Sequence, residues 1–192
     1  LVENKPFLEH LPTHNKTILR DEKGKSYYFF RNKYIEVTGR KITEYNYSEL
    51  PDVCIWKDHI VKHNIEFPKD DVPSKFSDFI NNVASHKKDR IKAFRSAIGY
   101  LLYNYSDRSD SQAVLLYDEE ITDSNTPQGG TGKGIFASAL GELREMVTVD
   151  GKKIDTNDRF RYQNVNESTQ IFRVDDLKAN VNFENFNSLL TE

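Results

Sequence analysis

The sequence predicts a mixed chain in which an α+β N-terminal module and a helical pair precede a partial α/β core. Aromatic and apolar residues flank a short polar turn within 27–38, which favours a hairpin, and apolar residues recur every three or four positions across 76–102, which favours helices. Between the hairpin and the helices, the two prolines of the stretch FPKDDVP interrupt both the strand period and the helix period. These patterns divide the chain into a strand-rich α+β module (1–67), a linker (68–73), a helical domain (74–106) and the partial core (107–192).

The N-terminal module contains the predicted hairpin. Its strands, 27–30 and 34–38, lie on either side of the turn Arg31-Asn32-Lys33. The aromatic residues of this run stand beside basic ones, and such a surface could stack nucleic-acid bases. The alternation also suits a strand that turns one face to the core, and its two-residue period favours this second interpretation.

Two helices are predicted in the helical domain. Ser74 or Ser77 can cap the first, and the apolar spacing of the second runs from Ile91 to Leu102. Basic residues give the polar side of the second helix a positive bias that could meet a phosphate backbone, although a solvated helix face is the simpler interpretation. These basic residues are Lys87, Lys88, Arg90, Lys92 and Arg95.

The most informative stretch is the loop PQGGTGKG at 127–134. A predicted buried strand at 113–117 precedes it and a predicted helix at 134–147 follows it, so strand, loop and helix stand in the order that cradles a phosphate. Bare N–H groups at the helix start point at the anion, and Lys133 supplies a positive charge. We therefore predict ATP binding by Gly129, Gly130, Thr131, Gly132, Lys133 and Gly134.

The loop departs in two places from the P-loop pattern G-x-x-x-x-G-K-[ST]. Pro127 stands where the first glycine is expected, and Gly134 stands where a hydroxyl would bind magnesium. Thr131 or Ser138 would be less well placed substitutes for that hydroxyl. Magnesium binding weaker than usual is therefore expected.

A second motif, QIFRVDD at 170–176, is a mostly apolar strand that ends in two acids. Asp175 would hold Mg²⁺ through water, and Asp176 would orient or deprotonate the attacking water. The 42 positions between Lys133 and Asp175 (175 − 133) leave room for a helix, one extra strand or hairpin and the return strand. Taken alone, the two acids would be read as an ordinary turn after a core strand.

Composition sets further bounds. The 192 residues carry a formal charge of −3, from 27 basic and 30 acidic residues, so any nucleic-acid contact must be local. A single cysteine excludes an internal disulfide framework, and no apolar run approaches the roughly 20 residues that span a bilayer. We expect a globular, cytoplasmic protein without membrane contact, present here as a piece of a longer chain. Two His-x-x-x-His pairs, His10 with His14 and His59 with His63, lack further ligands, so a metal site there is discounted.

Residues 76–192 resemble the superfamily 3 helicases, particularly the poxvirus-type primase-helicases of phages and mobile elements. The segments IGYLLYNY, QGGTGKGIF and IFRVDD carry this resemblance. It implies an AAA+-like P-loop ATPase that forms a ring, commonly a hexamer, and moves along DNA during replication. On this analogy Lys133 contacts the phosphates, while Asp175 and Asp176 serve Mg²⁺ and water. The resemblance also places a sensor residue and an arginine finger after Glu192, so this chain is expected to hydrolyse ATP poorly.

Two other classes of function stay open. A P-loop phosphotransferase acting on a small molecule would share Lys133, but it should have an arginine-rich lid, whereas Arg144, Arg159, Arg161 and Arg173 are scattered. A non-catalytic module for oligomerisation or docking is compatible with Pro127 and Gly134. Turnover stimulated by DNA would favour the helicase, and turnover stimulated only by a metabolite would favour the phosphotransferase.

Overall fold

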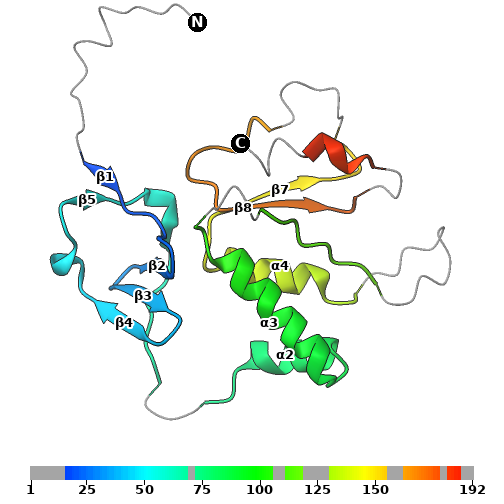
Figure 1. The fold of residues 1–192 in the computed structure, drawn as a ribbon, viewed down its shortest axis with the longest axis horizontal. Coiled ribbons are helices and arrows are strands. Elements are labelled where there is room, and N and C mark those ends of the chain that lie inside the picture. The colour runs from blue at the N-terminus through cyan, green and yellow to red at the C-terminus, as the bar shows by residue number, and fades with distance from the viewer. Residues whose placement is uncertain are drawn as a thin grey trace, which may run out of the picture.

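The computed structural model describes residues 16–68, 72–105, 111–118, 130–154, 162–177 and 181–186 (Figure 1). This part of the chain holds three α-helices and three small sheets, so the predicted mixture of α and β structure is confirmed. Within these residues, no helix combines the length and the apolar character that crossing a membrane requires.

The N-terminal module is built on a four-stranded sheet in the order β4-β3-β2-β6. Strands β2, β3 and β4 form an antiparallel meander, and β6 joins the free edge of β2 in parallel. A small parallel pair, β1 with β5, lies apart from this sheet. The bounds are β1 Thr17–Ile18, β2 Lys25–Phe30, β3 Tyr34–Thr38, β4 Ile42–Tyr45, β5 Val53–Cys54 and β6 Ile60–Val61, with short 3₁₀ turns at Tyr47–Glu49 and Lys57–His59.

The predicted hairpin is confirmed, and its aromatic residues form a core. Tyr27, Phe29 and Tyr34 are buried together, and Phe30 is 2% exposed on the other side of β2. Burial of such rings in this cluster removes them from solvent, which is a main source of stability for a small sheet. The interpretation that this run stacks nucleic-acid bases is therefore wrong for these four side chains.

Helices α2 (Lys75–Val83) and α3 (Lys88–Leu102) form the predicted helical pair. Ser74, rather than Ser77, is the N-cap of α2, and its hydroxyl accepts the backbone N–H of Ser77 at 3.3 Å. The apolar faces of both helices pack on α4 and β8 in a second core, centred on Ile80, Phe136, Leu140 and Ile171.

The C-terminal part contains helix α4 (Lys133–Gly141) and the parallel strands β7 (Met146–Asp150) and β8 (Ile171–Asp175), followed by a 3₁₀ turn at Phe183–Phe186. The predicted sequence of helix, extra strand and return strand is confirmed. The predicted helix at 134–147 is too long, because Met146 already belongs to β7. Gly141 is a poor helix former, and the β-branched residues at 147–149 favour a strand.

The prediction of a buried strand at 113–117 is wrong. Residues 111–118 form no strand, and the side chains of Leu115 and Tyr117 are 60% and 81% exposed. In Figure 1 this segment runs in the same direction as β7 and β8. It pairs with neither of them, and a strand without a hydrogen-bonded neighbour leaves its backbone groups to solvent.

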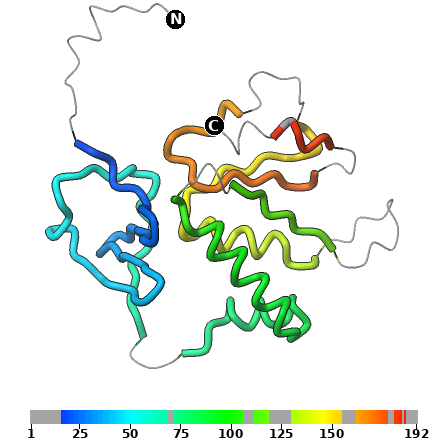
Figure 2. Tube along the Cα trace, viewed as in Figure 1, coloured from blue at the N-terminus to red at the C-terminus, as the bar shows by residue number. Residues whose placement is uncertain are grey.

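Figure 2 shows the N-terminal module beside the helices and strands that follow it. Arg144, in the turn between α4 and β7, joins the two parts of the chain. Its guanidinium donates to Asp21 at 2.7 Å and to the carbonyl oxygens of Tyr27 and Leu102, and it lies 4.0 Å from the ring centre of Tyr28. The side chains of Arg144 and Asp21 are each 3% exposed. A buried charge pair with this many hydrogen bonds fixes the N-terminal module against the end of α3 and the turn after α4.

Candidate nucleotide-binding site

The glycine-rich loop enters α4 through backbone that favours glycine. Gly130 and Gly132 have φ values of 92° and 94°, and Gly132 is the N-cap residue of α4. A Cβ atom on Gly132 would lie 2.9 Å from Cε2 of Phe79, so the loop packs directly on α2. Gly129 lies outside the described residues. The described part of the predicted loop thus enters the helix sharply through two glycines, Gly130 and Gly132, as a phosphate cradle requires.

Lys133 is the first residue of α4 and makes contacts with two oxygen-bearing side chains. Its Nζ atom donates to both carboxylate oxygens of Asp118, at 2.6 and 2.5 Å, and to the hydroxyl of Thr131 at 3.0 Å. Hydrogen bonds from Lys133, and then from Thr131, lower the pKa of Asp118 below its ordinary value. The ammonium group therefore lies beside the loop and is paired with a carboxylate that the sequence analysis did not single out.

The remaining predicted loop residues differ in how well they suit a magnesium ion. Gly134 lies in the first turn of α4, and nothing lies within 4 Å of where its Cβ would be. Ser138 is exposed more than one helical turn beyond Lys133, whereas the Thr131 hydroxyl already touches the Lys133 ammonium. Of the two predicted substitutes for a P-loop hydroxyl, Thr131 is the better placed.

The predicted acidic pair lies at the carboxyl end of β8. Asp175 is its last residue, lies in register with Asp150 of β7, and forms an ion pair with Arg173 at 2.9 Å. The N–H of Gly151 donates to the main-chain oxygen of Asp175 at 2.6 Å, and a Cβ on Gly151 would lie 2.8 Å from that oxygen. The two strand ends are therefore held tightly together.

Asp176 follows in a left-handed backbone conformation, with φ at 53°. Its carboxylate pairs with Lys152 at 2.8 Å, and both side chains are mostly exposed. Exposed pairs of this kind contribute little to stability and exchange partners readily. The Asp176 carboxylate is thus available for interaction with a ligand at this edge of the sheet, whereas the Asp175 carboxylate would first have to leave Arg173.

The loop and the acidic pair lie on the same side of the small α/β unit. Helix α4 and β7 are joined by the short turn 142–145, which reverses the chain, and β8 is parallel to β7. The start of α4 and the carboxyl ends of both strands consequently face the same way (Figure 1). Ligands of open α/β sheets bind outside the carboxyl ends of the strands. Among the described residues, no hydrogen bond or ion pair joins the two motifs directly.

The chemistry of the donors fits magnesium better than a transition metal. Oxygen ligands are what Mg²⁺ prefers, and it is commonly held by one or two carboxylates together with phosphate oxygens. Asp175 and Thr131 supply such oxygens. No cluster of three or more His, Cys, Asp or Glu side chains suited to a metal occurs in the described part of the chain. His59 instead contacts the carbonyl of Ser168 at 2.8 Å, and the ring of His63 lies against Phe30.

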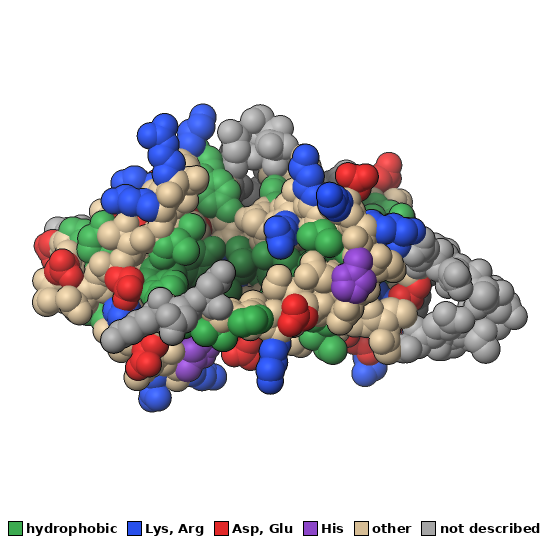
Figure 3. Space-filling view, turned by 90° about the horizontal axis from the view of Figure 1, so that it is seen from below, with side chains coloured by type: hydrophobic (Ala, Val, Ile, Leu, Met, Phe, Trp, Pro, Cys, Tyr) green, Lys and Arg blue, Asp and Glu red, His purple; other side chains and the backbone are tan. Residues whose placement is uncertain are grey.

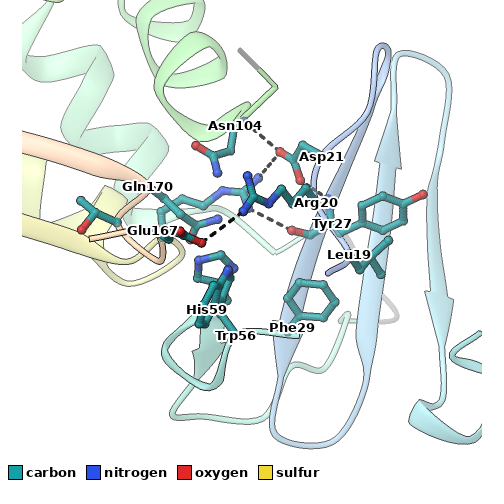
Figure 4. Close-up of a pocket in the computed structure, with 12 residues that line it drawn as sticks. Leu19, Arg20, Asp21, Tyr27, Phe29, Trp56, His59, Asn104, Glu167 and Gln170 are labelled. Atoms are coloured by element: carbon teal, nitrogen blue, oxygen red, sulfur yellow. Dashed lines mark hydrogen bonds and ion pairs between the residues drawn. The ribbon is translucent and has the colours of Figure 1, made fainter. Parts of the chain in front are cut away.

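A separate polar cavity of about 160 Å³ lies at the junction of the two parts, away from the loop and the acidic pair (Figure 4). Its lining comes from the N-terminal module, from Asn104 after α3, from Arg144 and from the segment before β8. Sequence reasoning missed both Arg144 and Asp118. An isolated arginine after a helix and a single acid after an apolar run carry no periodic or motif signal, so only their partners in space identify them.

Comparisons with protein-family models, with curated proteins and with solved structures found no match. The site is therefore defined by its own geometry. A glycine loop leads into a helix at Lys133, and two acids end a parallel strand on the same side.

Proposed function

We propose that this chain is the ATP-binding part of a replicative DNA helicase of the primase-helicase type, an AAA+-like P-loop ATPase of a phage or mobile element. In the parent protein it would form a ring of identical subunits and couple ATP hydrolysis to DNA unwinding. The observation that carries the proposal is the position of Lys133. Its ammonium lies at the start of α4, directly after Gly130 and Gly132, and is already paired with an anionic group, Asp118.

The geometry suggests how a nucleotide would bind. The outer phosphates would replace Asp118 as the partner of Lys133, while N–H groups of the loop and of the first turn of α4 donate to phosphate oxygens. Asp175 would approach a phosphate-bound Mg²⁺ through water, and the ion would neutralise charge on the phosphates. Asp176 would orient the attacking water or accept its proton, once its carboxylate leaves Lys152.

The order of elements supports a helicase-type ATPase over a small-molecule kinase. A helical pair packs on the nucleotide-binding helix, and a strand ending in two acids follows after one intervening strand. Of the four scattered arginines, Arg159 and Arg161 lie outside the described residues, and the other two are already engaged. Arg144 is buried in the junction and Arg173 pairs with Asp175. A lid of free arginines, which a phosphotransferase would use to clamp its second substrate, is not found in the described part.

Equilibrium binding of a fluorescent ATP analogue with Mg²⁺ tests the proposal. Saturable binding should be lost in Lys133→Ala, because the phosphates lose their cationic partner, and weakened in Asp175→Ala. Lys153→Ala is the matched control, since it removes a lysine that is 85% exposed and outside the loop. Absence of binding in the unsubstituted chain, or equal binding in this chain and its three variants, would refute the nucleotide site.

Hydrolysis of ATP is then measured with and without single-stranded DNA. Stimulation by DNA supports the helicase, whereas turnover that responds only to a small-molecule acceptor would replace it by a phosphotransferase. A magnesium titration of nucleotide affinity tests the departure at Gly134. Gly134→Ser should lower the magnesium concentration needed for half-maximal binding, because it restores a hydroxyl where P-loop proteins bind the ion.

A further inference from the structure

We infer that one face of α3 binds the phosphate backbone of DNA. This face is defined by Lys88, Lys92 and Arg95, which follow one another at four- and three-residue spacing and therefore lie on one side of the helix. All three side chains are exposed, and none takes part in an ion pair within the described part of the chain. The inference deepens the proposed function, because it names the surface that meets DNA.

The basic face borders a groove between α2 and α3. The groove measures about 520 Å³ and is lined by Asn81 of α2 together with Lys88, Ile91, Lys92, Arg95 and Ser96 of α3. No acidic side chain contributes to this lining, although Asp78 and Asp89 occur in the same helices. Figure 3 looks onto the molecule from this side, where basic side chains stand at several separate points among acidic and uncharged ones. A polyanion would thus meet positive charge and hydrogen-bond donors without a facing carboxylate.

The position of the charges on the helix argues for a ligand rather than for stability. Lys87 is the N-cap residue of α3 and Lys88 is its first residue. Cations at a helix N-terminus are unfavourable because they meet the positive end of the helix dipole. Two lysines and the helix dipole together concentrate positive potential at one end of the groove, which favours a bound phosphate.

The spacing of the three cations matches a nucleic-acid backbone. Seven positions separate Lys88 from Arg95, which corresponds to about 10 Å along a helix that rises 1.5 Å per residue. DNA carries one phosphate for about every 3.4 Å of rise on each strand, so this distance covers about three phosphate-to-phosphate steps along the duplex axis. Ser96, exposed beside Arg95, adds a hydroxyl donor. An extended phosphate chain fits this face better than a single compact anion.

The salt dependence of DNA binding tests the inference, with labelled 20-nucleotide single strands and 20-base-pair duplexes and without nucleotide. The variant K88Q/K92Q/R95Q should bind more weakly, and its plot of log affinity against log salt should lose about 2 to 3 units of slope, because three fewer counterions are released. Between 50 and 200 mM salt, three such contacts correspond in the unsubstituted chain to about a 40-fold loss of affinity for the duplex and about a 20-fold loss for the single strand.

The matched control is K23Q/K41Q/K62Q, which removes the same charge from exposed positions of the N-terminal module. It should keep the slope of the parent chain. Equal slopes for the two triple variants, absence of DNA binding, or binding of polyglutamate in place of DNA would overturn the inference. The two proposals fail separately, because Lys133→Ala should retain DNA binding and K88Q/K92Q/R95Q should retain binding of the ATP analogue.

Discussion

Two features of the structure require glycine at position 132. Gly132 has a left-handed backbone conformation, and it packs closely against the ring of Phe79. In Gly132→Ala a Cβ atom would lie 2.9 Å from the Phe79 ring at a φ of 94°, so we expect a loss of about 2 kcal/mol or more in the free energy of unfolding. Gly134→Ala is the control, because its Cβ meets open space and alanine favours the helix by up to about 1 kcal/mol. Urea denaturation measures both, and equal stabilities would contradict the loop geometry.

Asp118 competes with a nucleotide for the ammonium of Lys133. In Asp118→Asn the ion pair is lost, so Lys133 is free to meet phosphate, and we expect the ATP analogue to bind about two- to fivefold more tightly. Asp52→Asn, which breaks the exposed pair with Lys16 instead, is the control and should leave binding unchanged. Weaker binding in Asp118→Asn would mean that Asp118 assists the nucleotide rather than competing with it.

At the scale of elements, α4 connects the candidate site to the junction between the two parts. It begins at Lys133 and is followed directly by the turn that carries Arg144. Arg144→Met leaves the buried Asp21 without its charge partner, and we expect a loss of about 3–5 kcal/mol in the free energy of unfolding. Arg20→Gln breaks only the exposed contact with Glu167 and should cost less than about 1 kcal/mol.

A double variant tests whether the charge pair itself, rather than side-chain packing alone, stabilises the junction. Asp21→Asn combined with Arg144→Met removes both charges and keeps an acceptor for the N–H groups of Tyr27 and Asn104, so the double variant should be more stable than Arg144→Met alone. A double variant that loses the sum of the two single losses would contradict the role of the pair. Chemical denaturation followed by tryptophan fluorescence reports the junction, because Trp56 lines the cavity beside Arg144.

His59 makes the same junction sensitive to pH. Burial lowers the pKa of His59 below its ordinary value of 6.5, partly offset by its hydrogen bond to Ser168. Because the unfolded chain takes up a proton near pH 6.5 and the folded chain does so only at lower pH, stability should fall as the pH drops below about 6.5. His59→Gln should flatten this slope between pH 7.5 and 5.5, because it removes the buried imidazole. An unchanged slope in His59→Gln would assign the pH dependence to other groups.

At the scale of the whole molecule, a nucleotide should stabilise the fold. Its site joins α4, the loop on α2 and the end of β8, so binding to the folded state alone should raise stability by about 2.7 kcal/mol at 100 times the dissociation constant. For a chain of this size that corresponds to an increase in Tm of about 5–10 °C. Thermal unfolding with Mg²⁺ and ATP measures it. Lys133→Ala should lose the increase, and K88Q/K92Q/R95Q should retain it.

Local patterns in the sequence were sufficient for most elements. The turn at 31–33, the apolar spacing of α2 and α3, and the apolar run before Asp175 predicted the hairpin, the helices and β8, because their signals come from neighbouring residues. The glycine loop likewise predicted the sharp entry into α4, since Gly130 and Gly132 adopt backbone that other residues avoid.

Only the tertiary structure decided what depends on contacts between distant residues. The run 113–117 has the composition of a strand, but without a pairing neighbour it stays exposed. Arg144 pairs with Asp21, which lies more than a hundred positions away in the sequence, and Lys133 pairs with Asp118 on the other side of the glycine-rich loop. The sequence by itself determined the elements and the residue types of the candidate site. The tertiary structure determined which charges are paired, because burial and pairing are set by packing partners that no local pattern specifies.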